Sequence, residues 1–424
     1  MNVKVRLTIM NFLEFAVWGA YLTSMGTYLA KAGMATYIGW FYSVQGIVSL
    51  FMPALMGIVA DRWMQSQRVL SLCHLLAGVF MVAAAYYGYT AGEQVEFATL
   101  FSLYTVSVAF YMPTLALTNS VAYSVLDAAG LDTVKHFPPI RVFGTIGFIC
   151  SMWVVDLTGM QENALQLAYS GVLSLVLAVY ALTLPACPVG NSGRQTSLVD
   201  ALGLRAFALF KQKRMAIFFV FSMLLGVCLQ ITNGFANPFI NAFNGIEAYA
   251  DSFGVQHANI LISLSQMSET LCILLIPFCL SKLGIKRVML IAMLAWVLRF
   301  GFFAVGNPGP GVWLFILSMI VYGVAFDFFN ISGSLFVDKE TDLGIRSSAQ
   351  GLFMMMTNGL GATIGTLSAQ AVINHYVYNL DESVPAEVVM QGWSTSWYIF
   401  AAYALVVAVL FALVFRYKHV PETE

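Results

Sequence analysis

The sequence predicts an all-α membrane protein with twelve spanning helices arranged as two six-helix bundles. Of its 424 residues, 59% are hydrophobic and 10% are charged, whereas a soluble globular domain carries about a quarter charged residues. Apolar stretches of about 20 residues, the length needed to cross a bilayer, recur along the whole chain. Lysine and arginine concentrate in alternate connections between them. These observations indicate a polytopic membrane protein, and the net charge of −1 gives no sign of a nucleic-acid-binding domain.

The expected spans fall into two sets of six, separated by a polar connection. Residues 1–185 form the expected N-terminal bundle, residues 186–213 a cytoplasmic linker and residues 214–424 the C-terminal bundle. The linker is rich in Gly, Ser and Asn, which is typical of a flexible connection. The first span lacks a small-residue cleavage site, so we expect it to be retained. The expected spans are 7–31, 37–60, 69–90, 97–125, 138–156, 164–185, 214–240, 256–280, 288–306, 311–335, 346–373 and 394–416.

The distribution of basic residues predicts the orientation of the chain. Both termini and the loops after even-numbered spans carry nearly all lysines and arginines, whereas the opposite loops carry only Lys31. By the positive-inside rule, both termini are expected in the cytoplasm of a multi-pass protein of the cytoplasmic (inner) membrane. The six cysteines lie mostly in apolar stretches without metal-ligand spacing, so we expect reduced thiols and no metal site.

Two short basic loops, 220 residues apart, reveal an internal repeat. Residues 57–63 follow the second span and residues 277–287 follow the eighth, the equivalent position in its set of six. Two parallel six-helix halves are typical of the major facilitator architecture. The first loop resembles the signature of that superfamily at Gly57, Asp61 and Arg62. We expect Asp61 and Arg62 to form a gate or ion pair; the alternative is a basic loop that only anchors topology.

Arg141 lies inside an expected span, where a charge costs at least about 2.5 to 3.5 kcal/mol. Pro138 and Pro139 precede it and suit the first turn of a helix. Helical spacing places Arg141, Thr145 and Phe148 on one stripe, a cation, a hydroxyl and a ring. Such a stripe indicates a helix that lines the path of a polar ligand.

Glu14 is the other ionisable residue singled out in the N-terminal half. It shares a helix face with Trp18 and Tyr21 and lies in the cytoplasmic third of the first span. Three roles remain open for it: an ion pair that closes a cytoplasmic gate, snorkelling to the interface, or proton carriage.

In the C-terminal half, Gln230 and Asn233 are three residues apart and share a helix face. Gly234 and Pro238 weaken the helix just beyond them. A discontinuous helix near the midplane marks the binding site in many transporters.

Further polar residues of the C-terminal half lie on the eighth and tenth spans. Gln266 and Glu269 form an i, i+3 stripe, and Tyr322 and Phe326 form an aromatic one that serves either packing or binding. A buried carboxylate among polar groups is suited to reversible protonation, so Glu269 is the first proton-coupling candidate and Asp327 the second. The alternative for Glu269 is a structural salt bridge. Asp327 points about 140° away from Tyr322 and is expected to serve a neighbouring helix.

Arg299, in the ninth span, is expected to pair with an acidic group or to lie at the outer interface.

The whole inventory of one cation, carboxylates, amides and rings suits a nucleoside, because a flat base stacks on rings and amides bond ribose and base edges. A sugar or another polar metabolite would be served about equally well. A nucleoside receptor that does not transport is a further alternative.

At these residues the chain resembles the nucleoside–proton symporter family of the major facilitator superfamily. The resemblance covers nearly the whole chain, although relatives can have glutamine in place of Glu14. The matching stretches are FPPIR with GTIGF (within 137–148), KRMAIFF (213–219), LQITN (229–233), SQ with SE (within 265–269), SMIVYG (318–323) and AFDFFNISGS (325–334).

The resemblance implies a transporter, not an enzyme, that imports nucleosides together with protons, with the proton as coupling ion and no cofactor. We expect the protein to be a monomer. It also implies that one shared pocket halfway through the bilayer receives polar side chains from both bundles. Asp327 matches an acidic position of the family. The implied substrate-binding residues are Arg141, Thr145, Phe148, Gln230, Asn233, Gln266, Glu269, Tyr322 and Phe326.

Overall fold

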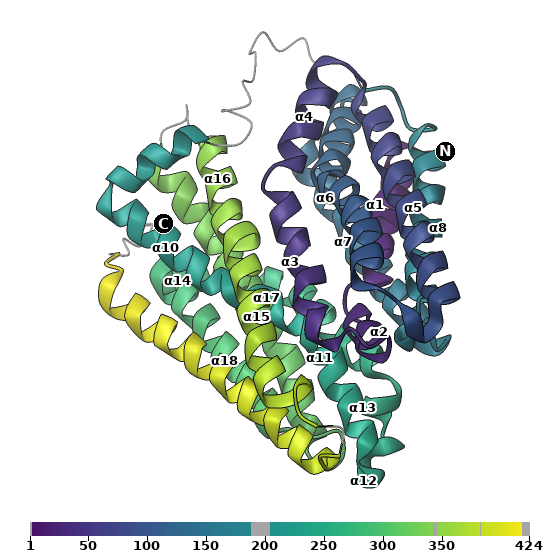
Figure 1. Cartoon of the computed structure of the whole chain (residues 1–424). Helices are drawn as coiled ribbons and strands as arrows, with labels where there is room; N and C mark the ends of the chain where they lie inside the picture. The colour runs from purple at the N-terminus through teal and green to yellow at the C-terminus, as the bar shows by residue number, and fades with distance from the viewer. Residues whose placement is uncertain (1, 188–203, 342–345, 382, 418–424) are drawn as a thin grey trace. The chain divides into compact units, whose positions relative to one another are not determined.

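The computed structural model describes all residues except 1, 188–203, 342–345, 382 and 418–424. The described residues form helices and connections without a β-strand (Figure 1), which confirms the all-α prediction. The chain divides into two compact units. Unit 1 comprises Met1–Tyr37 and Val44–Leu202, and unit 2 comprises Ile38–Ser43 and Gly203–Glu424. The boundary between Leu202 and Gly203 falls inside the predicted linker, most of which lies outside the described residues.

Unit 1 is built from long helices joined by short turns. Its helix α5 packs along α6 and α8, and α1 packs along α7. The first 3₁₀ turns, η1 (Ala35–Tyr37), η2 (Gly92–Gln94) and η3 (Met160–Glu162), lie between helices. The α-helices are α1 (Val3–Gly19), α2 (Met25–Lys31), α3 (Ile38–Ser49, in unit 1 from Val44), α4 (Met52–Arg62), α5 (Ser66–Ala91), α6 (Phe97–Ala128), α7 (Thr133–Leu157) and α8 (Leu165–Ala181).

Unit 2 contains longer helices and two π-helical stretches, η6 (Met355–Gly361) and η7 (Asn374–Tyr378). Its α14 packs along α15 and α18. The remaining elements are η4 (Leu204–Lys211), α10 (Lys213–Leu229), α11 (Ile231–Ala242), η5 (Phe243–Gly245), α12 (Glu247–Ala250), α13 (Phe253–Gln256), α14 (Ala258–Val305), α15 (Val312–Glu340), α16 (Arg346–Met354), α17 (Ala362–Ile373) and α18 (Ala386–Val414).

Among the described residues, seven helices are long and apolar enough to cross a membrane, or eight if the bent pair α3–α4 is one span. The other expected spans coincide with the broken pair α1–α2, the shorter α8, the series α16–η6–α17 and the second part of α14. The α14 helix contains two expected spans, because Gly284 breaks it with a φ of 75°. Counted in this way, the helices agree with the twelve expected spans.

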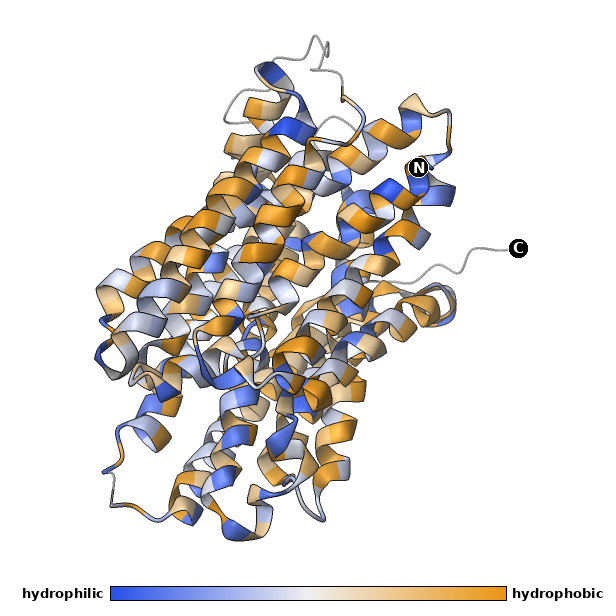
Figure 2. Ribbon diagram, turned by 90° about the vertical axis from the view of Figure 1, so that its right-hand side faces the viewer, coloured by the Kyte–Doolittle hydropathy of each residue, from blue (hydrophilic) through white to orange (hydrophobic). Residues whose placement is uncertain are grey.

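The surface of the helices is apolar, as lipid requires. Figure 2 shows that hydrophobic residues predominate along the helices. On α8, Val172, Val176 and Val179 are exposed, whereas Ser170 and Ser174 are buried. This pattern is the reverse of that in a soluble amphipathic helix.

Glycines allow close helix contact at equivalent places in the two units. In unit 1, Gly147 of α7 abuts the Phe12 carbonyl of α1. In unit 2, Gly365 of α17 abuts the Val227 carbonyl of α10. Small residues permit such close packing between membrane helices. Because each pair corresponds to the first and fifth expected spans of its set, the internal repeat is also present in the helix packing.

Candidate substrate and proton sites

The close packing of α1 on α7 positions Phe148, the aromatic residue predicted to bind substrate in unit 1. Trp18 of α1 meets Phe148 edge-on, with ring centroids 6.2 Å apart and an interplanar angle of 83°. Trp18 also lies 6.2 Å from the ring of Tyr111 on α6. Phe148 is 6% exposed. Trp18, itself packed on Tyr111, therefore holds the Phe148 ring in place.

Arg141 and Thr145 precede Phe148 on α7 by about two turns and one turn, respectively, and both are half-buried. The Arg141 guanidinium carbon is 3.9 Å from the centroid of the Phe15 ring, a distance at which a cation is attracted to a ring face. Pro138 and Pro139 lie in the second turn of α7 rather than the first, because the helix already begins at Thr133. The three predicted residues of unit 1 therefore share one helix, as expected from their spacing.

Glu14 is fully buried and has a partner that the sequence analysis did not identify. Its Oε2 lies 2.8 Å from Nε2 of His74 on α5, which is also fully buried. Thr114 donates a hydrogen bond to Oε1 at 2.6 Å, and Thr118 donates one to Oε2 at 2.9 Å. Full burial rules out the snorkelling alternative. The predicted gating role of Glu14 stays a prediction.

The remaining gate candidates lie at the end of α4. Arg62 is exposed at the last residue of this helix, and the side chain of Asp61 lies outside the described residues. Their pairing therefore stays a prediction.

In the described part of the chain, no three His, Cys, Asp or Glu side chains come together in a group that could hold a metal ion.

In unit 2 the helix is interrupted four residues before Gly234, not at Gly234 and Pro238 as predicted, because both of these residues lie inside α11. Helix α10 ends at Leu229 and α11 begins at Ile231, so Gln230 lies at the junction. The Asn233 side-chain amide donates to Gln230 Oε1 at 2.8 Å. The two predicted amides thus bond one another at the break, where both are half-buried.

The predicted rings of α15 form a stacked pair. Tyr322 and Phe326 have centroids 5.6 Å apart and planes 17° apart. Gln266 of α14 is 8% exposed, and its Oε1 accepts no hydrogen bond from the described residues. Because buried acceptors are almost always paired, this oxygen is available to a donor on a ligand.

Two carboxylates lie near this pair. Glu269 of α14 is half-buried, and Asp327 of α15 is 5% exposed. They lie within electrostatic range of each other and of Tyr322. Asp327 Oδ2 accepts no hydrogen bond from the described residues. The carboxylates and the predicted rings thus belong to one cluster.

Arg299 differs from both expectations for it. It is 2% exposed, so it is not an interface residue, and the described residues provide no carboxylate within ion-pair distance. Instead it donates to the Ser318 carbonyl at 2.7 Å and to Thr232 Oγ1 at 3.1 Å. Its guanidinium carbon lies 4.4 Å from the Tyr322 ring centroid. Neutral acceptors and a ring face therefore stabilise this charge.

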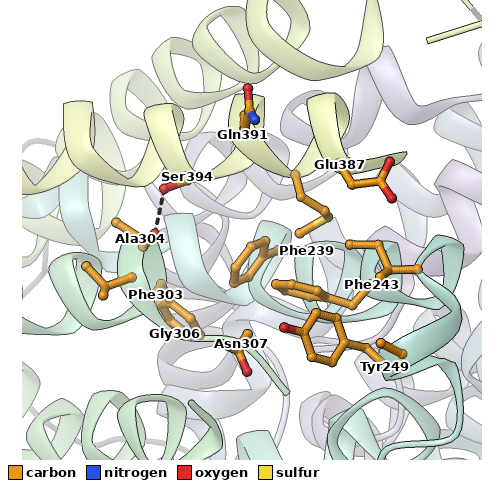
Figure 3. A pocket seen from close by; sticks show the side chains of 14 residues that line it. Phe239, Phe243, Tyr249, Phe303, Ala304, Gly306, Asn307, Glu387, Gln391 and Ser394 are labelled. Carbon is orange, nitrogen blue, oxygen red and sulfur yellow. Dashed lines mark hydrogen bonds between the residues drawn. The ribbon is translucent and has the colours of Figure 1, made fainter. Parts of the chain in front are cut away.

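A cavity of about 450 Å³ lies elsewhere in unit 2, beside η5, α12 and the ends of α14 and α18 (Figure 3). Aromatic rings, including Phe239, Phe243 and Tyr249, line it, and Ser394 donates to the Ala304 carbonyl at 2.5 Å across its edge. None of the nine predicted substrate residues lines it. Phe239 packs within an aromatic cluster of unit 2, so these rings have a packing role.

The fold and the intramembrane polar residues define the chain as a multi-pass membrane transporter of the major facilitator type. A solved D-xylose–proton symporter has the same fold, with a TM-score of 0.71 at 14% identity over 97% of each chain. A solved structure of the nucleoside transporter NupG agrees more closely. Its TM-score is 0.89 at 47% identity, over 99% of this chain and 100% of that one.

The chain belongs to the Nucleoside H+ symporter family, whose sequence profile matches residues 1–420. It is 49% identical to the nucleoside permease NupG of Escherichia coli over 424 residues, covering 99% of this chain and 97% of the relative. It is 48% identical to the xanthosine permease of Escherichia coli over 426 residues, covering 100% and 98%. The predicted family and fold are thereby confirmed, and the protein is a transporter, not an enzyme.

Proposed function

We propose that this protein imports nucleosides together with protons across the cytoplasmic membrane by alternating access. The observation that carries the proposal is the family match over residues 1–420, which includes all nine predicted substrate residues. The similarity to a nucleoside permease and a xanthosine permease supports nucleosides as the substrate class. From the distribution of basic residues, we further propose that both termini lie in the cytoplasm. A monomer is part of the same proposal.

The nucleoside is proposed to contact residues of both units. In unit 2, the stacked Tyr322 and Phe326 rings offer a face to the base, and Gln266 Oε1 offers an acceptor. Gln230 and Asn233 can exchange their mutual hydrogen bond for bonds to ribose or base. In unit 1, Arg141, Thr145 and Phe148 supply the cation, the hydroxyl and the third ring.

Glu269 is the proposed proton-coupling residue, and Asp327 is the second candidate. Two neighbouring carboxylates in a membrane protein strongly disfavour double ionisation, because like charges repel and burial penalises each charge. Their electrostatic proximity supports a proton held by this pair, as does Asp327 Oδ2, which accepts no hydrogen bond within the described part of the chain.

Substrate competition in proteoliposomes tests the substrate class. Uptake of labelled uridine is measured at two external pH values against unlabelled nucleosides and unlabelled sugars. Inhibition by nucleosides alone supports the proposal. Inhibition by sugars would favour the polar-metabolite carrier, and binding without uptake would favour the receptor.

A further inference from the structure

The buried pair of Glu14 and His74 in unit 1 is not used by the proton-coupling proposal above. Both side chains have no exposed surface. They come from α1 and α5, and their nearest polar neighbours are hydroxyls of α6 and α8. Unpaired charges in such a place are costly, so the position of each proton in this cluster matters.

Hydrogen-bond donors determine where the protons of His74 lie. The Ser174 hydroxyl donates its one hydrogen to the His74 carbonyl at 2.9 Å. When Ser174 donates to the carbonyl, its Oγ accepts in the second contact, 2.9 Å from His74 Nδ1. Nδ1 then carries a hydrogen, and a neutral imidazole protonated there has only a lone pair at Nε2.

Nε2 lies 2.8 Å from Oε2 of Glu14. An ionised carboxylate is also an acceptor only, and two lone pairs do not make a contact of this length. In this arrangement one further proton lies between the two side chains. It is held either by the carboxyl group of Glu14 or by Nε2 of His74, and in both cases the pair as a whole is neutral.

We propose that Glu14 and His74 form a second proton-binding site of the transporter, in unit 1 and separate from Glu269 and Asp327. The site holds its proton in the conformation described and gives it up in another conformation of the transport cycle. Only the part about the transport cycle rests on the proposed proton-coupled function. The presence of the proton rests on the donation from Ser174 to the His74 carbonyl. In the other arrangement Ser174 donates to Nδ1 and Nε2–H donates to an ionised Glu14, and the experiment below distinguishes the two.

The surroundings of the pair connect it to the predicted substrate residues of unit 1. The Tyr111 hydroxyl of α6 donates to the Glu14 carbonyl at 2.8 Å, and its ring lies 6.0 Å from that of His74. The same ring packs on Trp18, which contacts Phe148.

Other titratable groups face this cluster from the helices packed on it. From α5, Cys73 lies within electrostatic range of Glu14, and from α7, Arg141 lies within electrostatic range of Tyr111. Helix α8 presents the hydroxyl of Ser174. A cavity of about 10 Å³ between Tyr111 and Ser174 is close to the space that one water needs.

The test uses the full-length protein reconstituted in lipid, without nucleoside, and infrared difference spectroscopy. Wild type, Glu14→Gln and His74→Gln are compared near neutral pH. The proposal predicts one of two signatures: a neutral carboxyl band that Glu14→Gln removes, or an imidazolium band that both substitutions remove. An ionised Glu14 beside a neutral His74 would overturn the proposal. Glu162→Gln is the matched control, because Glu162 is half-exposed and pairs with Lys31 at 3.3 Å.

Transport then tests whether this proton takes part in the cycle. The pH profile of uridine uptake should lose one titration step in Glu14→Gln and keep it in Glu162→Gln. A profile identical to wild type in Glu14→Gln would overturn the role in the cycle. Thr118→Val keeps the carboxyl group and removes one of its donors, so it should shift the step without removing it, even if Glu14→Gln fails to fold. Wild-type protein without uptake would refute the proposed function, whereas the infrared result would still decide the proton site.

Discussion

Arg299 shows how one buried cation can be stabilised by neutral groups. Its guanidinium group donates to a carbonyl of α15 and to the Thr232 hydroxyl at the start of α11, and it lies over the Tyr322 ring. A planar guanidinium group can do all three, because its donors point outward in one plane while its face stacks. Arg299 thereby fixes the position of Tyr322, a predicted substrate contact, without itself being one.

Arg299→Lys should therefore weaken both stability and binding. Lysine keeps the charge but loses the stacked plane and one of the two acceptors, and an unsatisfied buried polar group costs about 1–3 kcal/mol. We expect a lower midpoint of thermal unfolding and about tenfold weaker uridine binding, a loss of about 1.4 kcal/mol. Arg214→Lys is the control, since Arg214 is half-exposed and its pair with Glu340 at 3.2 Å is a surface contact. Equal behaviour of the two variants would contradict the positioning role.

Glu269→Gln should separate binding from coupling. The amide keeps the size and hydrogen-bonding capacity of the side chain but cannot exchange a proton at neutral pH. We expect measurable uridine binding and no accumulation driven by a pH gradient, checked by equilibrium binding and by uptake in proteoliposomes. Glu340→Gln, the same substitution elsewhere in unit 2, is the control and should keep gradient-driven accumulation. Gradient-driven uptake at the wild-type level in Glu269→Gln would count against the assignment.

At the scale of elements, each unit depends on a helix pair that packs through glycine. Gly147 brings α7 against the backbone of α1, and Gly365 does the same for α17 and α10. These contacts place Trp18 against Phe148 in unit 1. The geometry of a predicted substrate residue therefore depends on a residue that has no side chain.

Gly147→Ala should destabilise the protein by about 1–3 kcal/mol, because the added methyl group overlaps the Phe12 carbonyl and overpacking carries this cost. The thermal unfolding midpoint in detergent measures the effect. Gly301→Ala in α14 is the control, since a Cβ there meets no atom within 4 Å and alanine is the better helix former. A loss of stability that is the same in both variants would show that the close contact is not responsible.

The helices and part of the site could be predicted from the sequence because their signals are local. Apolar length located the spans, and helical spacing placed Arg141 and Phe148 on one face of α7. The partner of Glu14 could not be predicted, because a pairing between α1 and α5 depends on how helices distant in sequence pack. His74 lies in an apolar stretch without a polar stripe that would have marked it. The break at Gln230 rather than at Gly234 likewise depends on tertiary contacts.

For the whole molecule, the structure and the family describe a transporter with charges in both units. Unit 1 holds the buried Glu14 and His74 together with Arg141, and unit 2 holds Glu269 and Asp327 beside the stacked rings. Burying ionisable groups in membrane helices is expensive and typically marks ion or proton pathways. Proton-coupled movement of a polar substrate explains this cost in both units.

Proton movement caused by the substrate tests this account most directly. Wild-type proteoliposomes are held at equal internal and external pH in a weakly buffered medium, and uridine is added outside while the external pH is recorded. The account predicts that the medium becomes more alkaline, that a protonophore abolishes the change, and that glucose added in place of uridine causes none. Uridine entry without any change of external pH would contradict proton-coupled import.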